Sequence, residues 1–354
     1  MAVYTTIDDP GSYLAYILTL SGSGATRSVT YGGANALQPD LVWAKCRSNG
    51  YNNNLCDSVR GATKIVKSDS TAGEVTDTDS LTAFGADGFT MGTNTPWNGS
   101  GPTYVYWGWK AGTTSGITTD GSTTITPNAY SFNQTAGISI LKFTGNQVNG
   151  AKLAHGLGVV PEMVFFKTLE GVSTWGGYNK TITATDYIKL DSTAAQTSYA
   201  LAFADTEPDA VNITLGSWEA TNGNVGMEEM IAYAFASVKG YSKIGSYTGN
   251  GNADGPFIYT GFRPAFTICK IYNGNTNNWK VVDDKRPGYN LNTKTINADS
   301  DAVEGTEDNS DYLSNGFKLR RTGNDVNGSG YKYIYISFAA NPCVNSEGVP
   351  GNAR

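Results

Sequence analysis

The segment PDLVWAK, residues 39–45, is the most informative stretch of this chain, because it returns as PEMVFFK, residues 161–167, and PAFTICK, residues 264–270. Each copy begins with proline and ends with lysine six residues later. One face of the expected strand carries Leu41, Met163 and Phe266 in the three copies. The other face carries Val42, Val164 and Thr267. Such a mainly apolar strand is typical of the centre of a sheet covered on both sides, and we expect the closing lysine to emerge into solvent.

Two further segments repeat in step with this strand. An apolar run that ends in glycine opens each copy, at residues 17–22, 140–145 and 244–249, and a closing strand follows at residues 104–111, 230–237 and 333–340. Alternation along the closing strand places on one face Val105, Trp107 and Trp109, then Ile231, Tyr233 and Phe235, then Ile334, Ile336 and Phe338. The chain is therefore three diverged copies of one module.

The fold predicted from these repeats is all-β, as three tandem β-sandwich modules of jelly-roll or lectin-like type. Asn-Gly pairs at residues 98–99, 222–223 and 327–328 precede the closing strands, and we expect tight hairpin turns there. The predicted divisions are module 1 with an N-terminal arm (residues 1–113), a linker (114–127), module 2 (128–239), module 3 (240–343) and a C-terminal tail (344–354). These names are kept below.

Composition argues against several classes of partner. The 31 acidic and 25 basic residues give a net charge of -6 without a large block of one sign, so we expect no nucleic-acid partner. No stretch approaches the roughly 20 apolar residues of a membrane span, and the N-terminus shows no signal peptide, so we expect folding in a cytoplasm without membrane insertion. The four cysteines are expected to be small buried apolar residues, with a Cys46–Cys56 bridge across a hairpin as the open alternative.

The residues that could carry catalysis do not recur between copies. His155 is the single histidine, and modules 1 and 3 have Gly33 and Tyr259 near that position, so we expect it to serve a turn or side-chain packing. The acidic pairs at residues 8–9 and 283–284 and the loop at 299–311 could serve glycoside hydrolysis or calcium binding, but they lack the spacing of a calcium loop. We therefore predict no catalytic residue, metal or cofactor.

Two tryptophans are the candidate binding residues. Trp97 and Trp218 lie shortly before Asn-Gly pairs in modules 1 and 2, where exposed aromatic rings could stack on sugars or anchor a protein. The alternative is that they cover the edge of a core. Arg60 and Arg286 occupy matching positions in modules 1 and 3, and we expect each to pair with a nearby aspartate and fix a turn.

Several strings together resemble a family of virion structural proteins of marine tailed bacteriophages, of the cyanophage kind. They span the whole chain: TTIDDPGSY, LQPDLVWAK, DSVRGATK, DGFTMG, HGLGVVPEM, GYSKIGSYTGNGNADGPFIYTGFRPAF, WKVVDDKRPGYN, YLSNGFKL and GVPGNAR. Module 2 departs from the pattern, since STWGGYNK, residues 173–180, lacks the expected arginine.

The resemblance implies a non-enzymatic particle component, located in the virion and assembled in the host cytoplasm. A short tail fibre or appendage that contacts the host is the leading hypothesis, with a capsid decoration protein and a carbohydrate-active depolymerase as alternatives. The implied partners are other virion proteins, further copies of the chain in a homo-oligomer, for which a trimer is one option, and a host surface glycan.

Overall fold

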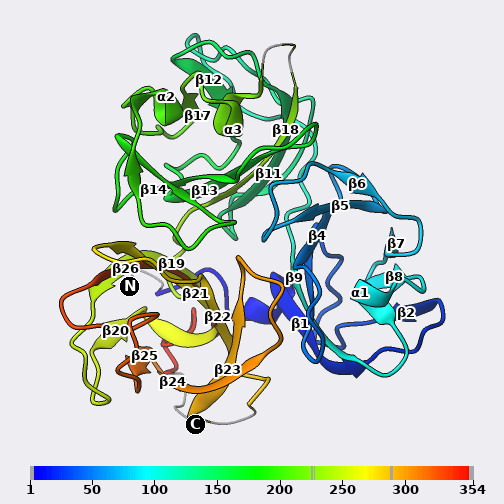
Figure 1. The fold of residues 1–354 in the computed structure, drawn as a ribbon, viewed down its shortest axis with the longest axis vertical. Helices are drawn as coiled ribbons and strands as arrows, with labels where there is room; N and C mark the ends of the chain where they lie inside the picture. The colour runs from blue at the N-terminus through cyan, green and yellow to red at the C-terminus, as the bar shows by residue number, and fades with distance from the viewer. Residues whose placement is uncertain (1–3, 225, 227, 288–289, 351–354) are drawn as a thin grey trace.

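The computed structural model describes residues 4–224, 226, 228–287 and 290–350, and it is all-β, as predicted. Residues 1–3 of the predicted N-terminal arm and residues 351–354 of the predicted tail lie outside this range. Three lobes surround a common centre, with module 1 in blue and cyan, module 2 in green and module 3 in yellow to red (Figure 1).

Module 1 contains a six-stranded sheet in the order β1-β9-β3-β4-β5-β6 and a three-stranded sheet in the order β2-β8-β7. The bounds are β1 (Leu14–Ser21), β2 (Arg27–Val29), β3 (Leu41–Cys46), β4 (Asn54–Asp57), β5 (Lys64–Lys67), β6 (Val75–Thr76), β7 (Leu81–Phe84), β8 (Phe89–Met91) and β9 (Thr103–Trp109), with a 3₁₀ helix at Pro10–Ser12 and the short helix α1 (Thr95–Asn98).

Module 2 contains a seven-stranded sheet in the order β10-β11-β18-β13-β14-β15-β16 and the strand pair β12-β17. The bounds are β10 (Ala129–Asn133), β11 (Ile138–Thr144), β12 (Ala151–Ala154), β13 (Met163–Thr168), β14 (Gly176–Asn179), β15 (Asp186–Lys189), β16 (Thr197–Ser198), β17 (Asn212–Leu215) and β18 (Glu229–Phe235), with helices α2 (Ala200–Phe203) and α3 (Glu219–Asn222).

Module 3 forms one eight-stranded sheet in the order β19-β26-β21-β22-β23-β24-β25-β20. The bounds are β19 (Ser242–Thr248), β20 (Phe257–Tyr259), β21 (Phe262–Asn273), β22 (Lys280–Asp283), β23 (Asn292–Asn297), β24 (Gly305–Leu313), β25 (Gly316–Leu319) and β26 (Lys332–Pro342). In all three modules the closing strand lies between the opening strand and the proline-led strand, as β1-β9-β3, β11-β18-β13 and β19-β26-β21.

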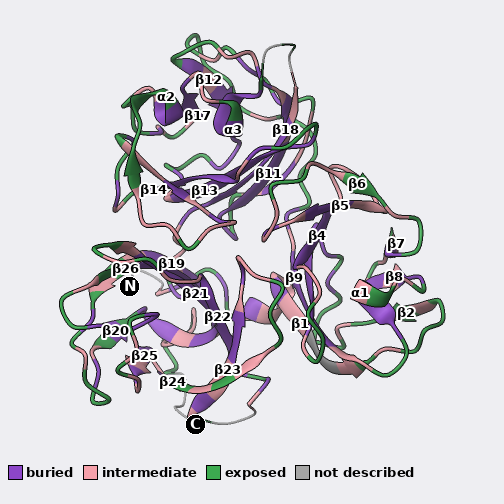
Figure 2. Cartoon of the chain, in the orientation of Figure 1, coloured by how far each residue is buried: buried purple, intermediate pink, exposed green. Residues whose placement is uncertain are grey.

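The proline-led strands are buried on both faces, as their composition predicts. On one face Val42 and Val164 pack in the local cores of modules 1 and 2, while the corresponding Thr267 of module 3 is also buried. On the other face Leu41, Met163 and Phe266 join a single apolar cluster built by all three modules. Strands β3 and β13 are buried along their whole length, and β21 is buried from Pro264 to Ile271; Figure 2 shows β13 in purple.

The shared central core is the main difference from three separate modules in a row. The inward face of each closing strand reaches the same cluster, and aromatic rings of different modules meet there. The Trp107 and Phe266 ring centroids lie 5.5 Å apart, and those of Phe165 and Trp279 lie 5.6 Å apart. The apolar inner face was evident in the sequence, but its partner was not, because a period of two does not say what a face covers.

The Asn-Gly pairs do not make the expected hairpin turns. Asn98 and Asn222 are the last residues of α1 and α3, and their side chains, like that of Asn327, are fully buried. Each side-chain oxygen accepts a hydrogen bond from the backbone of the loop after the opening strand: from Ser23 at 2.9 Å, Asn146 at 3.0 Å and Asn250 at 2.9 Å. The Asn-Gly pairs therefore recur because each module needs a buried asparagine side chain to bind this loop, and not because it needs a tight turn with positive φ.

The linker and the tail both lie against the protein. In the linker, Ile125 is buried and forms a bridge with Leu153 of module 2. In the tail, the backbone N–H of Ser346 donates to Asp8 at 2.7 Å. The four cysteines are free thiols, and β4 pairs Cys56 with Val42 while β9 pairs Tyr104 with Cys46, so Cys46 does not lie opposite Cys56.

Candidate functional site

The lysines that close the repeated segment are buried, contrary to our expectation that they emerge into solvent. Lys45, Lys167 and Lys270 are each 0% exposed. Each ammonium donates to a backbone carbonyl within its own module, at Tyr51, Ser173 and Asn277 respectively. A Lys side chain has three donors and no acceptor, so a cage of carbonyls can hold it away from water.

Each lysine also reaches into a neighbouring module. Lys45 donates to the carbonyl of Asp301 in module 3 at 2.8 Å, Lys167 to that of Thr71 in module 1 at 2.7 Å, and Lys270 to that of Thr193 in module 2 at 2.7 Å. The three contacts run in one cyclic order, so each module holds one neighbour and is held by the other. We call these three residues the lysine ring.

The loops that receive the lysine ring carry a fourth repeat that sequence analysis missed. It reads DSTA at residues 69–72 and 191–194 and DSDA at residues 299–302. Its aspartates accept backbone hydrogen bonds from the second strand region: Asp69 from Asn53, Asp191 from Trp175 and Asp299 from Trp279. The motif follows the lysine by 24, 24 and 29 residues, and this irregular spacing hid it.

Burial affects the acidity of the lysine ring. Removal from water lowers the pKa of Lys167 and of Lys270 to about 8, and it also lowers the pKa of Lys45. Nearby Asp191 and Asp299 oppose the shift for Lys167 and Lys270, since a negative charge favours the ammonium. These lysines tie modules together rather than act on a substrate, because no open surface reaches them.

The two arginines pair with aspartates, as expected. Arg60 Nε lies 2.6 Å from Asp57, and Arg286 Nε lies 2.6 Å from Asp283, with both arginine side chains almost completely buried. A glutamate completes each set, Glu74 at 3.3 Å from Arg60 and Glu304 at 3.1 Å from Arg286. We call each set of three an ionic trio. Both are structural, since they sit where one module meets the next.

The predicted binding tryptophans have different surroundings. Trp97 is 0% exposed and stacks on Tyr106 in the local core of module 1, so it matches the core alternative and not an exposed binding aromatic. Trp218 is half-buried at the start of α3, where its ring lies 4.4 Å from that of Tyr187 and 5.8 Å from that of Tyr199. The two are not equivalent, because Trp97 lies one residue before the buried asparagine and Trp218 four.

His155 is fully buried and hydrogen-bonded on both ring nitrogens. Nδ1 accepts from the backbone N–H of Leu157 at 3.2 Å, and Nε2 lies 3.1 Å from the carbonyl of Asp209. Burial lowers its pKa, which favours the neutral ring. Within the described residues no group of three or more His, Cys, Asp or Glu side chains could hold a metal ion.

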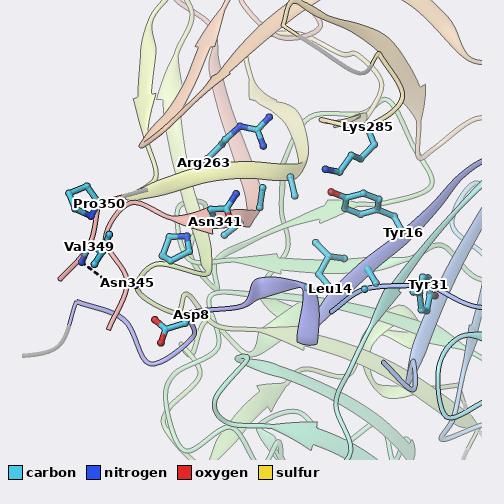
Figure 3. Close-up of a pocket in the computed structure, with 17 residues that line it drawn as sticks. Asp8, Leu14, Tyr16, Tyr31, Arg263, Lys285, Asn341, Asn345, Val349 and Pro350 are labelled. Atoms are coloured by element: carbon cyan, nitrogen blue, oxygen red, sulfur yellow. Dashed lines mark hydrogen bonds between the residues drawn. The ribbon is translucent and has the colours of Figure 1, made fainter. Parts of the chain in front are cut away.

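A cleft of about 710 Å3 lies beside module 3 (Figure 3). Its walls come from the N-terminal segment and first strand, from strands β21 and β26, and from the tail. The lining includes Asp8, Tyr16, Arg263, Lys285, Asn341 and Asn345. This volume is within the range of small-molecule sites. Sequence analysis missed it, because its residues come from both ends of the chain.

The charged wall of the cleft is organised around Asp284. Arg263 Nη1 lies 2.8 Å from this carboxylate and Lys285 Nζ 3.7 Å from it, while Tyr16 donates its hydroxyl to it at 3.0 Å. Burial and the neighbouring carboxylate raise the pKa of Tyr16, so its hydroxyl stays protonated as a donor. Two cations therefore share one buried carboxylate at this wall.

The described residues thus define an all-β protein in which three repeated sheets close around one shared apolar cluster. By sequence the chain belongs to the DUF7483 family, described as a domain of unknown function, and the match spans residues 9–342. No curated protein matches the chain. Among the described residues, no helix is long and apolar enough to cross a membrane.

Proposed function

We propose that this chain is a non-enzymatic structural protein of a bacteriophage virion, displayed on the particle surface as a short tail fibre or appendage that contacts the host. Its partners are other virion proteins and further copies of itself. The observation that carries the proposal is the closed ring of modules, in which every triplicated feature is a structural tie. Among the described residues, the repeated lysines, asparagines and core side chains are all buried and hold the fold together.

The lysine ring and the shared core suit a part that must stay rigid while it is exposed. Because the three modules share one apolar cluster, opening any one junction would expose apolar surface of all three. We therefore expect the modules to resist local opening. Surface loops on such a body keep fixed positions relative to one another. This is the arrangement expected of a scaffold that presents loops to a partner.

The test is the position of the protein on intact virions. Gold-labelled antibody fragments against the purified chain should decorate the tail or its appendages in electron micrographs. Labels confined to the head would favour the second candidate, a capsid decoration protein that clamps neighbouring shell subunits. Particles that carry no label, although the antibody binds the protein after the particles are dissolved, would contradict display on the surface.

A carbohydrate-active depolymerase is the remaining alternative. A glycoside hydrolase needs two carboxyl groups that flank the scissile bond. The cleft offers Asp8 as a lining residue, but Asp284 is engaged by Arg263, Lys285 and Tyr16. The alternative predicts that purified protein releases sugar from host envelope and that Asp8→Asn abolishes the release. Envelope left intact by the wild type would support the scaffold proposal.

A further inference from the structure

The cations of the cleft are specific to module 3. Arg263 precedes the repeated proline, where modules 1 and 2 have Gln38 and Val160, and Lys285 lies two residues after the aspartate of the trio, where they have Val59 and Thr181. Because the scaffold positions on either side are shared, these two cations are additions to a common frame. Residues that differ between copies of one scaffold are where binding specificity is expected.

The charges at this wall do not cancel. Asp284 is a single carboxylate, only 2% exposed, and it faces both Arg263 and Lys285. Its other oxygen accepts the Tyr16 hydroxyl. One positive charge is thus left over at the cleft surface. The Lys285 ammonium is 46% exposed, so this second positive charge is accessible to an anion from outside, with which it can form a charge-assisted hydrogen bond.

Arg263 retains an unused donor. Its Nε has no hydrogen-bond partner within the described residues and lies just below the surface, so a ligand would reach it through a small rotation of this side chain, which is 18% exposed, while Nη1 is engaged by Asp284. A planar guanidinium offers five N–H groups in a fixed fork, which matches the two oxygens of a carboxylate. Lys285 is 46% exposed and can approach the same anion from the side of Tyr16, whose ring centroid lies 5.6 Å from its Nζ.

The rest of the cleft combines neutral polar groups with apolar surface. Asn341 and Asn345 provide amides, and Leu14, Val349 and Pro350 provide apolar contacts. The cationic wall and the Asp8 carboxylate lie on different sides of the cleft (Figure 3). A ligand with one carboxylate, several hydroxyls and apolar ring faces would match these groups.

We propose that the cleft beside module 3 binds an acidic saccharide, with Arg263 and Lys285 holding the sugar carboxylate and the amides and Asp8 contacting its hydroxyls. The proposal deepens the proposed function, on which its biological use rests, because the saccharide would belong to the host surface. The binding itself can be measured on the isolated chain. Its failure is therefore separate from a failure of the particle labelling.

The experiment is isothermal titration of the full chain with trigalacturonic acid, and with its methyl ester as a neutral match. The acid should bind, and the ester should bind at least about tenfold more weakly, since charge-assisted hydrogen bonds are the stronger kind. Arg263→Gln should weaken binding by about tenfold or more and Lys285→Gln by a few fold. Lys180→Gln is the matched control, because Lys180 is a surface lysine with 40% exposure that does not line the cleft.

Three results of titrations with the acid and the ester would overturn the proposal. They are the absence of heat with the acid, equal affinity for acid and ester, and unchanged affinity in the Arg263→Gln and Lys285→Gln variants. Inorganic sulfate or phosphate that displaces the acid at equal concentration would also overturn it, by revealing a general anion site. If Arg263→Gln fails to fold, the affinities of Lys285→Gln and Arg263→Lys test the proposal instead. Lys285→Gln changes a half-exposed side chain, and Arg263→Lys keeps the positive charge, so both variants should fold.

Discussion

Modules 1 and 3 differ from module 2 at a position that all three share. The ionic trios of modules 1 and 3 are Asp57, Arg60 and Glu74, and Asp283, Arg286 and Glu304, whereas module 2 has Asn179, Ile182 and Gln196 at the same places. The facing residue of the next module changes in parallel. Tyr233 donates to Asp57 at 2.7 Å and Trp107 donates to Asp283 at 3.2 Å, while the third equivalent residue is Ile336.

The backbone at these junctions is the same despite that difference. Glu74 donates its N–H to Leu169, Gln196 to Tyr272 and Glu304 to Arg47, at 2.9, 3.1 and 2.9 Å. The junction is therefore a backbone feature, and the side chains above it can be ionic or apolar. At two junctions a donor of the neighbouring module faces the trio, and at the third Ile182 and Ile336 belong to the same apolar cluster. The side chains at each junction are therefore suited to their own neighbour.

The largest effect is expected from breaking one trio. Arg286→Met removes the cation and leaves the buried Asp283 without its ion-pair partner, while Glu304 keeps its pairing with Arg47 at 2.8 Å. This should lower the free energy of unfolding by about 3–5 kcal/mol. Chemical denaturation followed by tryptophan fluorescence measures this. A loss below about 1 kcal/mol would contradict a structural role for the trio.

A graft of the module 2 residues sharpens the same comparison. The variant Asp283→Asn, Arg286→Ile and Glu304→Gln also carries Arg47→Tyr, since Arg47 pairs with Glu304 and the equivalent residue facing Gln196 is Tyr272. It should recover most of the stability lost in Arg286→Met, because replacing a whole buried ionic set by neutral residues is often close to neutral. If the graft is as unstable as the single variant, the trio is required by its junction and not interchangeable.

The next effect concerns the glycine that ends each opening segment, which is common to all modules. A Cβ on Gly145 would lie 2.2 Å from the carbonyl oxygen of Asn222, and one on Gly22 would lie 1.8 Å from that of Gly99. Gly145→Ala should therefore cost about 1–3 kcal/mol through overpacking. Gly121→Ala is the control, since nothing lies within 4 Å of that Cβ. Equal melting temperatures for the two variants would exclude the clash.

An effect of similar size is expected when one member of the lysine ring is removed. Lys167→Met leaves the buried carbonyl of Ser173 without its lysine donor, whereas that of Thr71 still accepts the N–H of Ser173 at 2.9 Å. One unsatisfied acceptor should lower the unfolding free energy by about 1–3 kcal/mol. Lys180→Met, at the surface, should leave it unchanged. If both variants unfold at the same denaturant concentration, the ring does not stabilise the fold.

The pH dependence of stability gives the smallest expected effect. The pKa of Lys167 is about 8 in the fold and about 10.4 when unfolded, so between these values the unfolded chain holds the extra proton. The lysine contribution to stability therefore rises with pH. The difference in unfolding free energy between wild type and Lys167→Met should grow, in favour of the wild type, by on the order of 1 kcal/mol from about pH 8 to about pH 10. A constant difference would mean that the lysine is not desolvated.

The repeat, the strand faces and the all-β fold could be predicted because they depend on local alternation. Leu41 and Val42 lie on opposite buried faces as the period of two requires. The exposure of Lys45 could not be predicted, because its partner Asp301 is brought near by the ring and not by the chain. The role of Asn98 was not predicted for a related reason. An Asn-Gly pair is typical of a tight turn, but here the Asn98 side chain is buried and accepts a hydrogen bond from the backbone of Ser23.

The cleft could not be predicted at all, because Asp8, Arg263 and Asn345 meet only in the folded molecule. What the sequence did indicate was where variation lies. Arg263 stands beside a repeated proline in a position that its sister copies fill with Gln38 and Val160.

The tie between Lys45 and Asp301 joins residues 256 positions apart, so the ring cannot close until almost the whole chain has left the ribosome. Until then Trp107 and Trp109 lack the ring of Phe266, which packs on both of them in the finished molecule. Contacts of such long sequence separation slow folding, and the uncovered apolar surface meanwhile favours association with other chains. We therefore expect the nascent chain to be prone to aggregation until module 3 has folded and covers the apolar surface of module 1.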